Sequence, residues 1–514
     1  MANIDFAELA KDPIYVGLVM GLLGIVVYFA MGRKSFGPVP KNVKSYAKIP
    51  GPFCLPIVGN LLSFASFTPT AHLTWSSWAK AFGKIYKYDV CGARYDVCGA
   101  RYVVVSDPKV LPVLLSSEKF TMDTHSAAVA GSLSKEAHAA IAPAFSTEGA
   151  KLQFDTTLKK AVELAESIDK NGPDTPTDMQ KALEDVVLDA VLTSAFDATP
   201  EKLEEVRKPV KASLHAMALK AARPVSNPFG FLMAAGPPVE TPKSKKAWLE
   251  LVKALRKRGP ASKSDPSLAA GLMRLTGAGG APVSDEELAR QAALVAANAL
   301  QPTAQTVAWT LFNIATTPSL QDGIAKELSE AGLLAHGQER EPRLPSYDDV
   351  QKLPYLNAVI KESQRLFPAA VIGPIRMAAE NAELGGYFIP KGTRVQVPLH
   401  TLHTAAWNWP QPERVWPERW TSVDATGAPK NGAGTDGLNS AFLPWGAACP
   451  STSVSEVQVA VIVAVMASRF KLALASGGRK AALERQTLDS ILHLKGGMKM
   501  IFVPRASIGF SSRL

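Results

Sequence analysis

One run of more than thirty residues constrains this chain more than any other feature, because it has the pattern of a single helix. Ser284 is followed three residues later by Glu287, which is the spacing of a capping box. The run ELARQAALVAANALQPTAQTVAWTLFNIA then keeps helical periodicity as far as Thr317 and Pro318. This predicts one long, largely buried helix that is kinked at Pro302.

The segments around this run have both helical and strand patterns. Between about residue 70 and residue 260 the pattern is mostly amphipathic helix, broken by an apolar, proline- and glycine-rich segment near 223–242. Another helix is expected from Ser319, and LPYLNAVIKESQRLFP predicts one that ends at Pro368. The run YFIPKGTRVQVPL favours strands. We therefore expect an α+β protein that is mostly helical and has small β-sheets.

Composition narrows the classes of function. The formal charge of +10 comes with no zinc-finger or RNA-binding motif, which argues against a nucleic-acid partner and favours a membrane surface and an acidic protein partner. The four cysteines are too few and too scattered for a disulfide framework, so they indicate a reducing compartment. A lone cysteine can then be a ligand. The four are Cys54, Cys91, Cys98 and Cys449.

The N-terminal region has the pattern of a membrane anchor. No residue from Pro13 to Gly32 is charged, and IYVGLVMGLLGIVVYFAM is long enough to cross a hydrocarbon layer of ~30 Å as a helix. Acidic residues precede this run, unlike in a signal peptide, and basic residues follow it, which puts the rest of the chain in the cytosol. We expect an anchor of one transmembrane helix over 1–34, a basic and proline-rich hinge over 35–53, and a catalytic domain over 54–514.

The heptapeptide DVCGARY occurs twice in immediate succession, at 89–95 and 96–102, within a strand-like stretch that ends in three valines. Cys91 and Cys98 can be interpreted as a metal-binding pair. A duplication of seven residues, either biological or from an imperfect gene prediction, explains the identical neighbours more simply, so the metal interpretation has little support.

Three motifs follow one another in the C-terminal part. Glu362 and Arg365 share one helix face in KESQRLFP, WPERW contains Arg419, and Cys449 comes at the head of another apolar helix. With the apolar N-terminal run, the proline hinge and the long helix, this order resembles the cytochrome P450 family over nearly the whole chain. The resemblance implies a cytochrome P450-like fold in which Glu362, Arg365 and Arg419 form a buried charged triad. It also implies that Arg376 binds a haem propionate.

The resemblance makes Cys449 the metal ligand, through its thiolate, of a haem b iron. Such a thiolate favours O–O cleavage, and the helix N-terminus after Cys449 would stabilise it. The family loop has Gly and Arg before the cysteine, whereas here Trp445 and Ala447 stand at those positions and Phe442 stands at the aromatic one. Alternatively, a tripeptide has been lost between PWGA, which contains Gly446, and ACPS. Either way the loop arginine is absent, and Phe442, Trp445 and Gly446 remain the loop residues predicted to bind haem.

Two further segments depart from the family pattern. In SLSKEAHAAIAPAFS the family usually has an aromatic residue or His, three residues, and then an Arg that binds haem. Here His138 fills either the aromatic position or that of the arginine. In the long helix the family's oxygen-binding groove aligns with Asn298 to Pro302, so that Gln301 replaces an acid and Pro302 replaces a threonine. Thr303 is an imperfect substitute for the hydroxyl that delivers protons.

Three functions are compatible with these features. The first is a haem-thiolate monooxygenase that takes electrons from an NADPH-cytochrome reductase and inserts one oxygen atom of O2 into a lipophilic small molecule. The second is a hydroperoxide isomerase or dehydratase in which Asn298 and Gln301, one helical turn apart, bind and cleave an O–O bond. The third is a haem-deficient membrane scaffold of the same fold. For all three, the expected location is the membrane of the endoplasmic reticulum, in contact with lipid.

Overall fold

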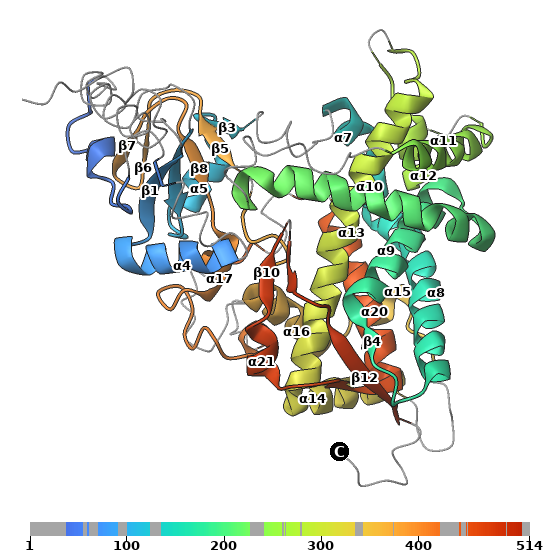
Figure 1. Cartoon of the computed structure of the whole chain (residues 1–514). Helices are drawn as coiled ribbons and strands as arrows, with labels where there is room; N and C mark the ends of the chain where they lie inside the picture. Colours follow the sequence, from blue (N-terminus) through green and yellow to red (C-terminus); the bar gives the residue numbers. More distant parts are fainter. Residues whose placement is uncertain are drawn as a thin grey trace, which may run out of the picture. The chain divides into compact units, whose positions relative to one another are not determined.

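The computed structural model in Figure 1 describes the greater part of the chain. The described residues are 38–54, 59–60, 70–90, 100–123, 135–226, 241–259, 262, 264–277, 280–334, 343–373, 375–421, 441–443, 449, 451–489 and 491–505. They divide into two compact units. The first contains the described residues up to 123 together with 375–398, and the second contains the described residues within 135–226, 241–373 and 399–505. The predicted anchor at 1–34 lies outside the described residues, as does most of the apolar segment near 223–242.

The first unit is built around a five-stranded sheet with the strand order β1-β2-β8-β5-β3. The strands are β1 Ile85–Val90, β2 Ala100–Val105, β3 Phe120–Met122, β5 Arg376–Ala378 and β8 Arg394–Gln396. The pair β2–β8 is parallel and the other pairs are antiparallel. Val103, Val104 and Val105 are fully buried in β2, as expected for β-branched side chains on a covered pleated surface. The other elements are η1 Tyr46–Lys48, α4 Ala71–Phe82, α5 Leu111–Ser116, β6 Ala382–Leu384 and β7 Tyr387–Ile389.

The two copies of the duplicated heptapeptide meet in the antiparallel pair β1–β2. Asp89 and Val90, the first two residues of one copy, pair with Arg101 and Ala100 of the other. One residue pair further from the connection between the strands, the rings of Tyr88 and Tyr102 stack with centroids 4.8 Å apart. The connection 91–99, with Cys91 and Cys98, lies outside the described residues.

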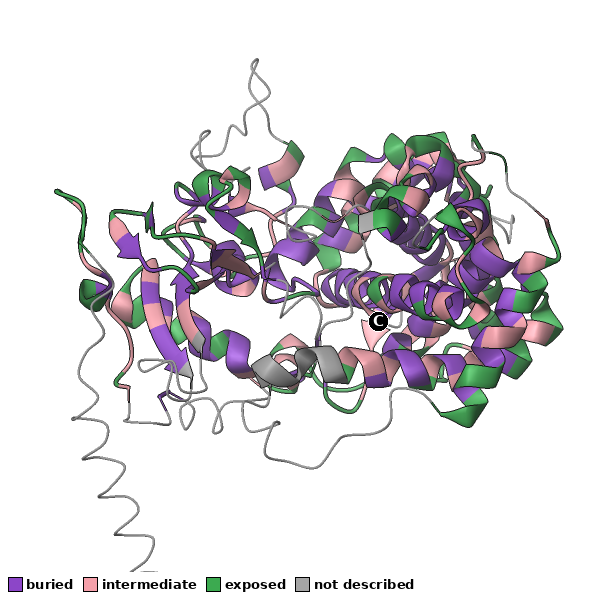
Figure 2. Cartoon of the chain, turned by 90° about the horizontal axis from the view of Figure 1, so that it is seen from above, coloured by how far each residue is buried: buried purple, intermediate pink, exposed green. Residues whose placement is uncertain are grey.

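The second unit is mostly helical, and its buried residues gather on the sides of the helices that face one another (Figure 2). Its helices are α7 Lys135–Ile141, η4 Ala142–Phe145, α8 Thr147–Asn171, α9 Met179–Phe196, α10 Pro200–Ser226, α11 Pro242–Arg256, α12 Leu268–Met273, α13 Asp285–Thr316, α14 Pro318–Glu330, α15 Tyr347–Gln351, α16 Pro354–Leu366, α17 Leu399–Thr404, α18 Glu418–Thr421, α20 Thr452–Arg469 and α21 Arg479–Leu483. Two small sheets complete it, one in the order β4-β12-β9 and one of β10 and β11. These strands are β4 Thr177–Asp178, β9 Phe470–Leu474, β10 Gln486–Leu488, β11 Leu492–Leu494 and β12 Lys499–Pro504.

The predicted long helix is confirmed as α13, which packs against α9, α11, α16 and α20 (Figure 1). Its start differs in one detail from a capping box. The Ser284 hydroxyl accepts from the Glu287 main-chain N–H at 3.2 Å, but the Glu287 carboxylate bonds to Arg290 and Gln291. A neighbouring guanidinium therefore replaces the main-chain N–H of Ser284 as the partner of that carboxylate. The helix is continuous through Pro302.

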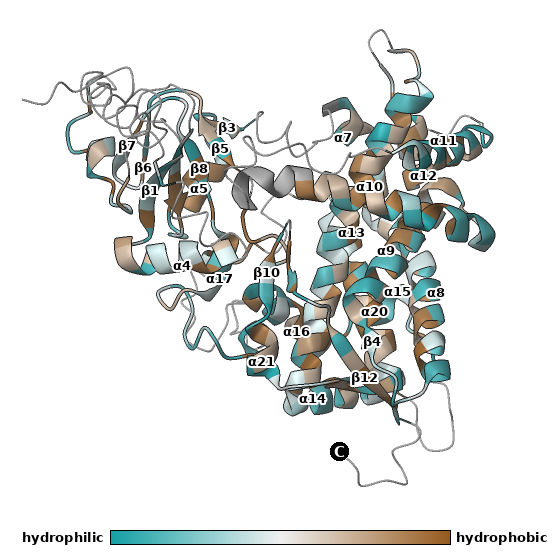
Figure 3. Ribbon diagram, in the orientation of Figure 1, coloured by the Kyte–Doolittle hydropathy of each residue, from teal (hydrophilic) through white to brown (hydrophobic). Residues whose placement is uncertain are grey.

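The prediction of a mostly helical α+β protein with small sheets is confirmed. The amphipathic region contains α8, α9, α10 and α11, and α8 has hydrophobic and hydrophilic patches along its length (Figure 3). The helices expected after Pro318 and before Pro368 are α14 and α16, and the strand-like run contains β7 and β8.

One helix among the described residues, α20, is long and apolar enough to cross a membrane. However, 78% of this stretch is buried inside the protein. A helix surrounded by protein in this way has the environment of a core helix, so α20 provides no support for a membrane span.

Candidate functional site

A buried charged cluster in the second unit surrounds Glu362. Arg365 donates to its two carboxylate oxygens at 2.9 and 2.8 Å, and Arg419 Nε donates to it at 3.3 Å. The three side chains are at most 1% exposed. Arg365 also donates to three main-chain carbonyl oxygens, those of His403, Pro412 and Arg414. The structure thus brings the three residues of the predicted triad together, with several partners for the buried charges.

Two tryptophans that the sequence did not single out complete the shell of this carboxylate. The main-chain N–H of Trp416 and the indole Nε1 of Trp420 each donate to Glu362 at 3.0 Å. The Arg419 guanidinium lies 4.6 Å above the Trp416 ring. Burial lowers the pKa of Arg419, and Glu362 opposes this effect. Both tryptophans belong to the WPERW motif, so their presence beside Arg419 was the available signal.

A carboxylate from another helix fixes the start of α16, the helix of Glu362. Leu353, at the N-cap, provides no side-chain cap, and Pro354 follows it. Instead, Glu327 of α14 accepts from the main-chain N–H groups of Tyr355 and Leu356 at 2.6 and 2.8 Å. A negative charge is favourable at a helix N-terminus, so Glu327 helps to position the helix of the triad. Sequence reasoning missed it because its partners are distant in the chain.

Aromatic contacts connect the triad with the segment that leads to Cys449. The ring of Trp420 lies 4.6 Å from that of Phe442, and Phe442 lies 5.4 Å from the ring of His403. Phe442 is one of the loop residues predicted to bind haem. The other two, Trp445 and Gly446, lie outside the described residues.

Cys449 is a free cysteine, half-buried, just before α20. Its Sγ lies 3.0 Å from the Ser451 hydroxyl, and its main-chain carbonyl accepts from the Thr452 hydroxyl at 2.8 Å. The positive end of the helix dipole favours negative charge near the start of α20. Cys449 thus presents a free thiol at the N-terminal end of a helix.

The predicted catalytic residues lie on α13 and have different environments. Asn298 is exposed, and its side chain donates back to the Leu294 carbonyl at 2.9 Å. Gln301 is half-buried. Thr303 is 1% exposed, and its hydroxyl has no hydrogen-bond partner among the residues that the structure describes. Because Pro302 has no N–H, the Asn298 carbonyl also loses its usual partner within the helix.

The two remaining predicted haem-binding residues differ in burial. His138 is exposed on α7 in the second unit. Arg376 begins β5 in the first unit and is half-buried, and its Nε is buried with no hydrogen-bond partner among the described residues. A buried guanidinium N–H without a protein partner is costly unless a ligand accepts from it.

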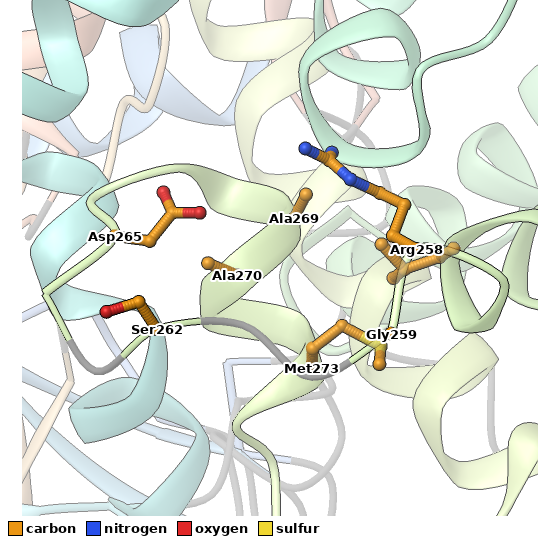
Figure 4. Close-up of a pocket in the computed structure, with 8 residues that line it drawn as sticks. Arg258, Gly259, Ser262, Asp265, Ala269, Ala270 and Met273 are labelled. Atoms are coloured by element: carbon orange, nitrogen blue, oxygen red, sulfur yellow. The ribbon is translucent and has the colours of Figure 1, made fainter.

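A pocket of about 160 Å³ lies between α11 and α12, and none of the predicted site residues lines it. Figure 4 shows Arg258 and Asp265 on opposite sides of it. Arg258 pairs with Asp197 at 2.9 Å, and Asp265 accepts from the Ser267 main-chain N–H at 2.8 Å. Since both charged groups have protein partners, this pocket gives no reason to assign a ligand.

A sequence profile of the cytochrome P450 family matches residues 49–502. The chain belongs to the cytochrome P450 family. Its helical unit with small sheets fits the P450 fold, and the buried Glu362 cluster and Cys449 lie within the matched range.

Relatives match this P450 over shorter stretches. It is 31% identical over 179 residues to cytochrome P450 10 of Lymnaea stagnalis, which is 34% of this chain and 30% of that one. It is 35% identical over 139 residues to cytochrome P450 3A5 of Homo sapiens, covering 27% and 26% of the two chains. Piperic acid synthase of Piper nigrum is 29% identical over 207 residues, which is 40% of this chain and 39% of that one. These alignments therefore span well under half of each relative.

Parts of the described P450 fit a haem group. In the second unit, Cys449 provides a free thiol at the start of a helix, and the buried Thr303 hydroxyl has no hydrogen-bond partner among the described residues. In the first unit, taken by itself, the buried Nε of Arg376 has no partner among the described residues. These are the residue types that hold an iron, a propionate carboxylate and an oxygen ligand. His138 does not fit as well, because it is exposed.

Proposed function

We propose that this P450 is a haem-thiolate monooxygenase that inserts one oxygen atom of O2 into a lipophilic small molecule, with electrons supplied from NADPH through a reductase. The observation that carries the proposal is the free, half-buried Cys449 at the start of α20, next to the segment that contacts the Glu362 cluster. A haem bound through a cysteine thiolate supplies O–O cleavage and attack on unactivated C–H bonds.

The residues of the chain would bind and orient this group. The Cys449 thiolate would ligate the iron, with the Ser451 hydroxyl as a hydrogen-bond donor to sulfur at 3.0 Å. Arg376 would bind a propionate carboxylate through its Nε, which has no hydrogen-bond partner in the part of the chain that the structure describes. The Thr303 hydroxyl would serve as a hydrogen-bond and proton donor on α13. His138 would contribute little, since its side chain is exposed.

A second candidate, a hydroperoxide isomerase or dehydratase, is favoured by the composition of α13. Beyond Arg290 this helix contains no charged residue, so it has no carboxyl group to relay protons. An enzyme that rearranges a hydroperoxide already has the O–O bond in its substrate and needs no delivered electrons. Asn298 and Gln301 would then bind the peroxide oxygen atoms.

Electron dependence distinguishes the two candidates. The full-length protein in membranes would be supplied either with NADPH and a cytochrome P450 reductase plus a panel of sterols, terpenoids and fatty acids, or with a fatty-acid hydroperoxide alone. Monooxygenation predicts product only with NADPH and reductase. Rapid rearrangement of the hydroperoxide without reductase, together with no NADPH-dependent product, would replace the first candidate by the second. Failure to bind haem at all would support the third candidate, the haem-deficient scaffold.

We further propose that the chain is a single-pass protein of the endoplasmic reticulum membrane, anchored by 1–34, joined by the hinge 35–53 to a catalytic domain over 54–514 that faces the cytosol. The uncharged run at 13–32 and the basic residues after it support this topology. The net charge of +10 supports an acidic reductase and anionic lipid as partners. After deletion of 1–34, we expect the protein to stay partly associated with membranes at low salt, because its net positive charge attracts anionic lipid. Complete release into the soluble fraction would contradict this contribution of the positive charge.

A further inference from the structure

We infer that His403 is a positioning residue for the sulfur ligand, because its imidazole holds the main chain at Leu443, where the segment that leads to Cys449 begins. This inference rests on the proposed function, in which Cys449 ligates haem iron. His403 belongs to α17 and was not singled out by the sequence motifs.

The hydrogen bond is specific to one ring nitrogen. The main-chain N–H of Leu443 donates to His403 Nε2 at 3.0 Å. The same imidazole lies against the ring of Phe442, with 5.4 Å between centroids. His403 is fully buried, so water does not compete for this bond.

The surroundings of His403 keep the accepting nitrogen unprotonated. Burial and the nearby Arg365 charge lower its pKa to about 3, and the Gln364 main chain opposes this effect. The imidazole is therefore neutral near neutral pH. Since Nε2 accepts from Leu443, the ring proton belongs on Nδ1.

His403 also connects this segment to the charged cluster. Its main-chain carbonyl accepts from Arg365 at 2.9 Å, while its side chain accepts from Leu443. On the other side of Phe442, the Trp420 ring lies 4.6 Å away and its indole N–H donates to Glu362. The two residues before the loop are thus held from both sides by groups that contact the triad.

The bond at Leu443 affects the position of the Cys449 sulfur because few residues separate the two. Leu443 is six residues before Cys449. The Cys449 carbonyl is itself held by Thr452 at the start of α20. A short segment with both ends fixed limits the positions that Sγ can adopt. The loop lacks the arginine that the P450 pattern places before the cysteine, so anchoring from outside the loop gains importance.

Three substitutions separate hydrogen bonding from packing. In His403→Gln the terminal side-chain oxygen can take the place of Nε2. In His403→Asn the shorter side chain cannot reach the main-chain N–H of Leu443. In His403→Leu the acceptor is lost, while much of the apolar volume is kept. His493→Leu is the matched control, because His493 is a half-buried histidine of the same unit that pairs with the exposed Asp489. Far-UV circular dichroism identifies any variant that fails to fold.

Two readouts are taken on the full-length protein. The first is amide hydrogen exchange at Leu443, which does not depend on haem. We expect roughly tenfold or faster exchange in the Leu and Asn variants than in the wild type, and protection close to wild type in the Gln variant. The second is the absorption of the reduced, carbon-monoxide-bound protein. There we expect the Leu and Asn variants to lose much of the red-shifted Soret band of a thiolate-ligated haem, and the Gln variant to keep it.

The outcomes separate this inference from the proposed function. If the wild type has the red-shifted band and His403→Leu keeps it at full intensity with unchanged exchange at Leu443, His403 does not position the ligand. If Leu and Gln behave alike, its role is packing, and the inference is again wrong. A wild type without the band overturns the proposed function, and unchanged Leu443 protection in His403→Leu overturns the hydrogen-bond assignment independently.

Discussion

Glu362 accepts hydrogen bonds from Arg365, Arg419, Trp416 and Trp420 while its own side chain is fully buried. The sequence could predict that Glu362 and Arg365 share a helix face, because they are three residues apart. The family resemblance could add Arg419. The WPERW motif placed both tryptophans beside Arg419, but their bonds to Glu362 and the His403 bond could not be predicted, because these depend on how loops fold against α16.

Removal of the Glu362 carboxylate is expected to destabilise the protein strongly. Glu362→Ala leaves two buried guanidinium groups without their carboxylate, which costs roughly 3–5 kcal/mol. Urea unfolding followed by circular dichroism measures the free energy. Glu287→Ala is the matched control, because Glu287 and Arg290 have the same i,i+3 spacing at 2.6 Å but are 38% and 55% exposed. The control should lose less than about 1 kcal/mol. Equal losses in both variants would show that burial of the triad has no energetic importance.

Because of His403, the free energy of unfolding should depend on pH through the binding of one proton. Its pKa in the fold is lowered from 6.5 to about 3, so stability from this group is complete above about pH 6.5 and decreases as the pH falls toward 3. In this window the unfolded chain binds a proton that the folded chain does not, which corresponds to about 1.4 kcal/mol per pH unit. Unfolding free energies at pH 7, 6, 5 and 4 should therefore fall less steeply in His403→Gln. Parallel curves for the two proteins would contradict the neutral, buried imidazole.

Among whole elements, α13 and α16 were predictable because their periodic patterns are long and end at prolines. The two-unit arrangement has no such local signal. Strand β2 pairs with β8 and strand β3 pairs with β5, although β5 and β8 lie more than 250 residues further along the chain. Only the folded chain shows that Arg376 shares a sheet with the duplicated segment.

The register of β1 and β2 predicts that one copy of the heptapeptide can be removed. Val90 pairs with Ala100, so nine residues connect the strands, and deletion of 91–97 leaves Cys98 and Gly99. Two-residue hairpin loops with glycine are common, and the shorter connection lowers the entropy cost by about 1 kcal/mol. We expect an unchanged or higher thermal midpoint. Deletion of 91–98 is the control: it leaves one residue, which cannot close the turn, and should lower the midpoint. A deletion of 91–97 that unfolds the protein would show that the register needs both copies.

For the whole molecule, the order of motifs along the chain predicted the family, and a sequence profile over residues 49–502 agrees. The expected domain of 54–514 remains a prediction, and within it the described residues form two compact units. The assignment of function depends on Cys449, a residue whose loop departs from the family pattern. Whether Cys449 ligates haem iron is therefore the most direct test of the assigned function.

The decisive measurement is the absorption spectrum of the reduced, carbon-monoxide-bound full-length protein, with and without Cys449→Ser. The account predicts the red-shifted Soret band of a thiolate-ligated haem in the wild type and its loss in Cys449→Ser, because only a cysteine provides the required electron donation. Cys54→Ser is the matched control, since Cys54 is the other cysteine that the structure describes, and it should leave the band unchanged. A band that survives Cys449→Ser, or a wild type that binds no haem, would contradict the account.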